Sequence, residues 1–224
     1  MTSDIRLVIF DFDGTLGDTR RIIVTTMRDT LRQRGLPLAD EAKCASTIGL
    51  PLVDCFRKLL PQAGEEELVA CADTYREIFE THREQLAPTL FPHVKETLET
   101  LHRRGILMTI ASSRTSQSLH SLVDALGITH CFSLVVGCGD VARAKPDPEP
   151  VLHTLRKMSV APSHTLVVGD MDVDILMGAR AGCHTCGVTY GNGTRRQLED
   201  AGADFIIDGM DELLSSDIFA DPER

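Results

Sequence analysis

The chain has 224 residues, of which 42% are hydrophobic and 25% charged, and it carries a formal net charge of −10. This length and composition suit one globular α/β domain with an insertion, whereas the acidic balance and the lack of a basic run argue against a nucleic-acid partner. No apolar run approaches the roughly 20 residues of a membrane span, and the first residues show no signal-peptide pattern, so we expect a cytoplasmic protein without a membrane partner.

The first expected strand is followed by a long segment that carries only helical patterns. Leu7–Phe10 is a short apolar run, typical of a buried strand. Residues 18–87 then show no strand pattern, and we expect an all-helical domain there, inserted into a core formed by residues 1–17 and 88–224. Gly14–Asp18 and Ala87–Pro92 would connect the two parts. The helices are expected at Ile22–Arg34, Leu52–Leu60 and Glu65–Leu86.

After the insertion, short apolar runs alternate with amphipathic stretches. Val94, Leu98 and Leu101 share one face of a helix, which Gly105 then ends. This alternation is the pattern of a parallel sheet covered by helices, so the expected fold class is α/β with a Rossmann-like parallel sheet. The further strands are expected at Leu107–Ala111, Ser133–Val136, Thr165–Val168, Thr185–Val188 and Phe205–Ile207.

Carboxylates follow two of the expected strands. Asp11 and Asp13 come directly after the first strand, and Asp170 follows Thr165–Val168, with Asp174 four residues further on. Buried carboxylates are costly to hold together unless a cation neutralises them. If the two strands are neighbours, Asp11, Asp13 and Asp170 converge, and three oxygen donors around one point suit Mg²⁺.

Two other polar features also follow apolar runs. Ser112 and Ser113 come after a strand, where a hydroxyl and the backbone N–H groups of a turn suit anion binding. Lys145 stands directly before Pro146, and its charge can balance both the carboxylates and an incoming phosphate. Each feature alone is common in loops, but the four in this order favour a phosphate-processing site.

Four segments resemble the signature motifs of the haloacid-dehalogenase-like superfamily. They are FDFDGTL (10–16), ASS (111–113), AKPDP (144–148) and VVGDMDVD (167–174). TIGLP (47–51) and AGADFI (201–206) are similar to its phosphoglycolate-phosphatase-like branch. The resemblance spans nearly the whole chain. It implies a Rossmann-like core with a helical cap, and a Mg²⁺-dependent phosphatase whose partner is a small phosphorylated metabolite, with 2-phosphoglycolate as the first expectation.

The resemblance also implies a role for each motif residue. Asp11 would be the nucleophile that forms an aspartyl-phosphate, and Asp13 the general acid and base. Ser112 would hydrogen-bond the transferring phosphoryl group, while Lys145 would orient Asp11 and offset its charge. The implied Mg²⁺ ligands are the Asp11 carboxylate, the Asp13 backbone carbonyl and the Asp170 carboxylate, supported by Asp174.

Substrate contacts are expected mainly from the cap. Arg20 and Arg21 open the first cap helix close to Asp13 in sequence, and we hypothesise that one of them meets an anionic group on the substrate. Gly49 belongs to the expected specificity loop, Ser46–Leu52. Thr15 and Ser113 are the remaining substrate-binding candidates. Arg114 stands where Lys is frequent in the superfamily.

Several alternatives use the same residues. Pyrophosphate and a sugar phosphate are alternative substrates, and a β-phosphoglucomutase-like enzyme would use Asp11 and Asp13 to pass phosphate between hydroxyl groups. A sensor that only binds a phosphorylated ligand is disfavoured, because it has no need of the full set of Asp11, Asp13, Lys145 and Asp170. The sequence makes no prediction of the oligomeric state.

Seven cysteines are spread along the chain, and Cys183 and Cys186 form a C-x-x-C pair. A zinc site needs further ligands at suitable spacing, and the sequence offers no second cluster. We expect reduced thiols that pack as small hydrophobic side chains.

Overall fold

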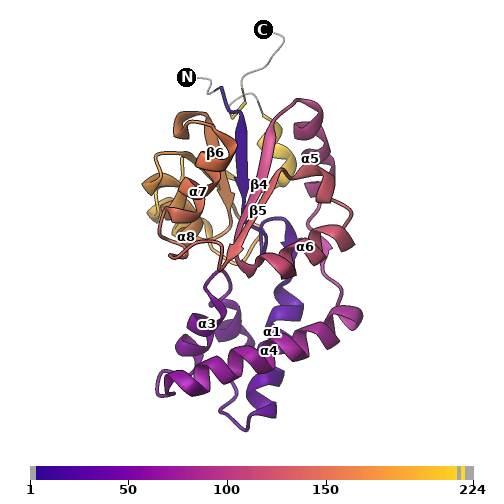
Figure 1. The fold of residues 1–224 in the computed structure, drawn as a ribbon, viewed down its shortest axis with the longest axis vertical. Helices are drawn as coiled ribbons and strands as arrows, with labels where there is room; N and C mark the ends of the chain where they lie inside the picture. Colours follow the sequence, from indigo (N-terminus) through magenta and orange to yellow (C-terminus); the bar gives the residue numbers. More distant parts are fainter. Residues whose placement is uncertain (1–3, 216–217, 220–224) are drawn as a thin grey trace.

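The computed structural model describes residues 4–215 and 218–219, and its centre is a six-stranded sheet (Figure 1). The strand order is β5-β4-β1-β6-β7-β8, and every pairing in this sheet is parallel. The expected α/β fold class is therefore confirmed. The strands are β1 (Leu7–Phe10), β4 (Leu107–Thr115), β5 (Leu134–Cys138), β6 (Thr165–Gly169), β7 (His184–Val188) and β8 (Phe205–Ile207).

The first strand lies between β4 and β6, and this neighbourhood positions the site. All four residues of β1 are buried, which is typical of a parallel strand covered on both faces. Phe10 is in register with Ile110 of β4 and with Val168 of β6. The residues that follow these three positions therefore emerge together at the carboxyl edge of the sheet.

Helices cover both faces of the sheet, and the alternation of side chains along β1 determines which face each residue contacts. Val8 and Phe10 pack with Leu98 of α5 in one hydrophobic cluster. Leu7 and Ile9 pack with residues of α7 and α8 in another. The core helices are α5 (Val94–Arg103), α6 (Ser116–Ala125), α7 (Glu149–Met158), α8 (Asp172–Arg180) and α9 (Arg195–Asp200).

The remaining helices form a layer beyond the carboxyl edge of the sheet (Figure 1). This layer has its own hydrophobic cluster, in which Met27, Phe56 and Phe79 are buried. We call this layer the cap. Its helices are α1 (Arg20–Gln33), α2 (Glu41–Ala45), α3 (Leu52–Leu59) and α4 (Glu65–Gln85). Among the described residues, no helix combines the length and apolarity needed to cross a membrane.

The two connections between core and cap pair with each other, which the sequence did not predict. Gly17–Asp18 (β2) and Thr89–Leu90 (β3) form a two-stranded antiparallel sheet. Strands of two residues are too short to carry a periodic pattern. Gly17 also has a steric role, because a Cβ atom there would lie 3.0 Å from the ring of Phe12.

The end of β4 also differs from the prediction. The strand continues past Ala111 to Thr115, with an irregular register between these two residues, so that Ser112 and Ser113 lie in a strand extension instead of a turn. The next helix, α6, begins at Ser116 and is capped by Thr115, whose Oγ1 accepts a hydrogen bond from the backbone N–H of Ser118.

Candidate active site

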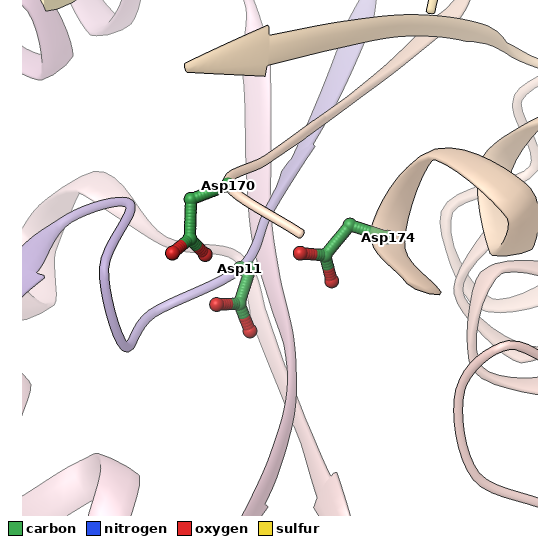
Figure 2. Close-up of side chains that lie close together, drawn as sticks. All are labelled: Asp11, Asp170 and Asp174. Atoms are coloured by element: carbon green, nitrogen blue, oxygen red, sulfur yellow. The ribbon is translucent and has the colours of Figure 1, made fainter. Parts of the chain in front are cut away.

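Three buried carboxylates meet at the carboxyl edge of the sheet (Figure 2). Asp11 follows β1, Asp170 follows β6, and Asp174 lies in the first turn of α8. One oxygen atom of each lies within 4.8 Å of the others. The parallel pairing of β1 with β6 is what brings Asp11 and Asp170 together.

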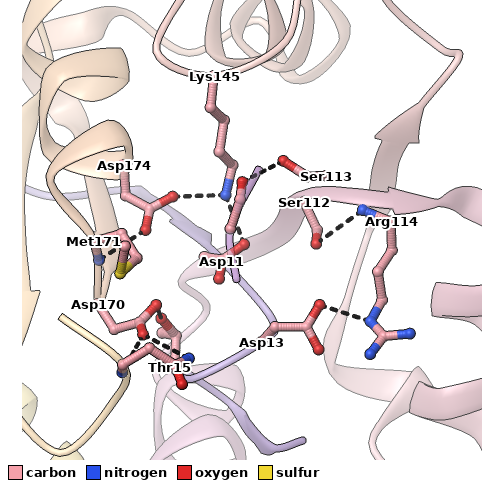
Figure 3. A network of polar contacts seen from close by, with 12 residues as sticks. Asp11, Asp13, Thr15, Ser112, Ser113, Arg114, Lys145, Asp170, Met171 and Asp174 are labelled. Atoms are coloured by element: carbon pink, nitrogen blue, oxygen red, sulfur yellow. Dashed lines mark hydrogen bonds and ion pairs between the residues drawn. The ribbon is translucent and has the colours of Figure 1, made fainter. Parts of the chain in front are cut away.

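Lys145 is the cation of this cluster (Figure 3). Its Nζ lies 2.6 Å from Asp11 Oδ1 and 2.6 Å from Asp174 Oδ1. Only 2% of the lysine side chain is exposed. Burial opposes its charge, but the attraction of the two carboxylates outweighs burial and raises the pKa of Lys145.

The cluster is short of positive charge. Three carboxylates share one ammonium group, so full ionisation would leave a net charge of −2. Burial, followed by repulsion from neighbouring carboxylates, raises the pKa of Asp11 from 3.8 to about 7, despite the attraction of Lys145. The same causes raise the pKa of Asp170 well above its usual value. An all-oxygen site with this charge deficit fits a hard divalent cation such as Mg²⁺.

Asp170 is fixed in place by neighbours that the sequence did not single out. It accepts hydrogen bonds from the backbone N–H (2.7 Å) and the side-chain amide (3.2 Å) of Asn192. Thr15 Oγ1 donates a hydrogen bond to Asp170 at 3.3 Å, so Thr15 supports this carboxylate. Although we expected Thr15 to bind substrate, it is not among the described residues that line the cavity between core and cap. Gly14 has a positive φ of 93°, and a Cβ atom there would lie 2.1 Å from Asp170 Oδ2.

Asp13 points away from the other carboxylates (Figure 3). Its two oxygens accept hydrogen bonds from Thr19 Oγ1 and Arg114 Nε, both at 2.6 Å. The Arg114 guanidinium in turn lies over the ring of Phe79 in the cap, 4.8 Å from the ring centroid. The side chain of Asp13 therefore lies outside the carboxylate cluster, where Asp174 takes the place that we expected for Asp13 beside Asp11 and Asp170.

The two serines after β4 have different surroundings. Ser112 Oγ accepts a weak hydrogen bond of 3.4 Å from the backbone N–H of Arg114 and faces the cavity described below. Ser113 Oγ donates a 2.6 Å hydrogen bond to the backbone carbonyl of Gly49. This contact joins the expected specificity loop of the cap to the core. Within that loop Gly49 has a positive φ of 98°, a conformation that glycine adopts readily.

Core and cap enclose a cavity of about 560 Å³, a volume typical of small-molecule sites. The core contributes Asp11, Asp13, Ser112, Ser113 and Arg114 to its wall. The cap contributes a largely apolar wall together with Gly49. This apolar part includes Met27, Ile48, Leu50, Leu52, Tyr75 and Phe79.

Arg20 and Arg21 do not face this cavity, which corrects the expectation that one of them meets the substrate. Both are exposed, and with Asp18 and Arg28 they line a separate depression on the surface of α1. Closeness to Asp13 in sequence was misleading, because the first turn of α1 directs both side chains to the outside.

The sequence profile of the family described as haloacid dehalogenase-like hydrolase matches residues 8–188. The chain belongs to this family. One relative of this hydrolase is "Probable phosphatase IndB" of Dickeya dadantii. The two sequences are 37% identical, and the match covers 94% of this chain and 92% of the relative. Pyrophosphatase PpaX of Oceanobacillus iheyensis is 34% identical over 94% of the chain and 96% of the relative.

Solved structures share the fold of this haloacid dehalogenase-like hydrolase. One is the crystal structure of a "predicted phosphoglycolate phosphatase" from Haemophilus somnus, with a TM-score of 0.86 and 26% identity. The match covers 95% of this chain and 97% of that one. The Rossmann-like sheet with its helices is therefore the fold of the family.

Cys183 and Cys186 are both buried in the core of the hydrolase. Burial raises the pKa of each thiol to about 12, so neither is a ready metal ligand or nucleophile. The geometry agrees with the expectation that they pack as small hydrophobic side chains.

Proposed function

We propose that this phosphatase hydrolyses a small phosphomonoester, with Asp11 as the nucleophile and Asp13 as the general acid and base. One observation carries the proposal: Asp11 and Asp13 line the same cavity but have different partners. Lys145 holds Asp11, whereas Thr19 and Arg114 hold Asp13. One carboxylate is thus placed to attack and the other to transfer protons.

The reaction would proceed in two displacements at phosphorus. A carboxylate oxygen of Asp11 attacks the phosphorus, and the bond to the alcohol oxygen breaks while Asp13 donates a proton to it. Asp13 then takes a proton from the water that attacks the aspartyl-phosphate, which releases phosphate and restores Asp11. Proton transfer of this kind contributes about 10²- to 10⁴-fold to a rate. Ser112, on the cavity wall, would hydrogen-bond the transferring group.

Mg²⁺ is the proposed cofactor. The Asp11 carboxylate, the Asp13 backbone carbonyl and the Asp170 carboxylate would hold it, with Asp174 in support. The bound ion would neutralise the repulsion between carboxylates and phosphate oxygens. The charge deficit of the buried cluster supports this assignment.

The first candidate substrate is 2-phosphoglycolate, and pyrophosphate is the second. The names of the relatives from Haemophilus somnus and Oceanobacillus iheyensis support these two compounds. We further propose that residues 18–87 act as the cap domain that selects the substrate, and that the protein is cytoplasmic. A phosphomutase remains the alternative, because it would use the same Asp11 and Asp13.

Phosphate release from a panel of phosphomonoesters and pyrophosphate, with Mg²⁺ or with EDTA, tests the proposal. We expect Mg²⁺-dependent release that Asp11→Asn abolishes. Asp18→Asn is the matched control, since Asp18 is exposed outside the cavity, and it should retain activity. If the folded protein releases no phosphate but converts a sugar phosphate in the presence of a catalytic bisphosphate, the phosphatase proposal fails and the mutase alternative holds.

A further inference from the structure

Arg114 is a cation on the cavity wall, and the proposed reaction steps assign no contact between its guanidinium and the substrate. Only 11% of its side chain is exposed, and it lies between the core residue Asp13 and the cap residue Phe79. A charge in such a partly buried position is screened less by water and salt than one on the surface. Its position over the ring of Phe79 adds a cation–π attraction that helps to hold the guanidinium in place.

The hydrogen-bonding capacity of the Arg114 guanidinium is only partly satisfied by the described part of the protein. Its Nε donates to Asp13, and its Nη1 makes a long contact of 3.4 Å with Ser118 Oγ. Its Nη2 is buried and has no hydrogen-bond partner within the described part of the chain. Buried donors are rarely left without a partner, and such a group points to a water, an ion or a ligand that completes it.

Other arginines are poorer candidates for binding an anionic group of the substrate. Arg76 and Arg83 also line the cavity, but their side chains are 53% and 37% exposed and are paired within α4 with Asp73 and Glu80. Arg20 and Arg21 lie outside the cavity altogether. Arg114 is the arginine next to the proposed acid–base residue.

We propose that Arg114 selects substrates that carry a second anionic group, a carboxylate or a second phosphoryl group, beside the phosphoryl group that Asp11 attacks. The anion would complete the Nη2 position and share the guanidinium with Asp13, and the planar fork of arginine suits such paired oxygens. This inference rests on the proposed phosphatase site and names the chemistry of its substrate.

Three substrates and two variants test this inference. The substrates are 2-phosphoglycolate, pyrophosphate and 2-hydroxyethyl phosphate, in which a neutral CH₂OH group replaces the carboxylate. Any effect of Arg114 on the placement of Asp13 changes kcat/KM for both phosphomonoesters, because each loses an alkoxide that needs a proton, and it cancels in their ratio. Pyrophosphate loses a phosphate group that needs this proton less, so a misplaced Asp13 would raise the preference for pyrophosphate and cannot explain a fall in it. We expect Arg114→Gln to lower the preference for 2-phosphoglycolate or for pyrophosphate over the neutral compound by about 10- to 100-fold, the range for a hydrogen bond to a charged group. Arg114→Lys should fall in between.

Arg20→Gln is the control and should leave the ratios unchanged. The preferred anionic compound identifies whether a carboxylate or a phosphoryl group is read. An equal loss for all three substrates in Arg114→Gln, a wild type without preference, or a lost preference in Arg20→Gln would each overturn the inference.

A binding experiment separates this inference from the proposed reaction. Calorimetry compares 2-phosphoglycolate, pyrophosphate and 2-hydroxyethyl phosphate on Asp11→Asn and on the double variant Asp11→Asn, Arg114→Gln. Tighter binding of an anionic compound to the first protein only would support the role of Arg114 even if turnover is absent. Equal affinities of both proteins would contradict it, whereas failure of the proposed function would appear as no phosphate release from the wild type.

Discussion

At the scale of single residues, the candidate site depends on a balance between three buried carboxylates and one buried ammonium group. Lys145 touches Asp11 and Asp174 at 2.6 Å each, and the sequence predicted its charge-balancing role from its place before a proline. Asn192 and Thr19 could not be predicted in the same way. They lie in loops without a motif, and only the folded chain brings them to Asp170 and Asp13.

Lys145→Met tests this balance. The substitution removes the cation and leaves carboxylates buried without it, a situation that typically costs about 3–5 kcal/mol. We expect a loss of that order in the free energy of unfolding, measured with urea in EDTA, together with loss of phosphate release. Lys157→Met is the control at an exposed lysine and should change stability by about 0.5 kcal/mol or less. Equal free energies of unfolding for the two variants would contradict the conclusion that Lys145 stabilises the buried carboxylates.

Gly14→Ala tests the close approach to Asp170. Gly14 and Gly35 both have a positive φ, but a Cβ atom at Gly14 would lie 2.1 Å from Asp170 Oδ2, whereas at Gly35 it meets nothing within 4 Å. Gly35→Ala should therefore cost about 1 kcal/mol, for the backbone conformation alone. Gly14→Ala should cost more, and it should lower Mg²⁺-dependent phosphate release at least tenfold. Similar activities for the two variants would count against a metal ligand at Asp170.

At the scale of elements, long and regular patterns were predicted well and short or irregular ones were not. β1 and β6 are continuous apolar runs, and their pairing, which the carboxylate argument needed, is present. The pair β2–β3 and the extension of β4 depend on tertiary contacts that leave no periodic pattern in the sequence. Arg20 and Arg21 do open α1 as expected, but the rotation of that helix, which decides where they point, is fixed by its packing on α4.

The buried carboxylates at the carboxyl edge of the sheet should make the free energy of unfolding depend on pH and on Mg²⁺. The pKa of Asp11 is raised to about 7 in the folded state from 3.8, so its stabilising contribution is complete below pH 3.8 and is lost as the pH rises through 7. In EDTA, this group should therefore make the protein less stable at pH 8 than at pH 5.

Mg²⁺ should oppose this trend, because it binds the ionised carboxylates. At a concentration 100-fold above its Kd, a ligand adds about 2.7 kcal/mol of stability, which corresponds to a Tm increase of about 5–10 °C for a chain of this size. Thermal scans at both pH values should show the larger increase at pH 8, and Asp170→Asn should reduce it. An equal increase at both pH values would contradict a site formed by these carboxylates.

At the scale of the whole molecule, the core holds the carboxylate cluster and the cap supplies most of the cavity wall. Each part has its own hydrophobic cluster, so changes in the cap wall need not disturb the carboxylates at the sheet edge. Polar and cation–π contacts between described residues join the two parts at the cavity, as for Ser113 with Gly49 and Arg114 with Phe79. We therefore expect substitutions at apolar cap positions such as Leu50 to change substrate preference more than the Mg²⁺ dependence. Parallel kcat/KM measurements on Leu50→Ala with the substrate panel check this, and an altered Mg²⁺ requirement would contradict it.

The proposed mechanism requires that Asp11 carries the phosphoryl group during turnover. Rapid quenching of the enzyme with substrate and Mg²⁺, followed by borohydride reduction, converts an aspartyl-phosphate into homoserine, which peptide mass spectrometry locates. Homoserine at position 11, absent without substrate and absent in Asp11→Asn, is the predicted result. Homoserine at another aspartate, or none at all in an enzyme that is turning over rapidly, would contradict the claim.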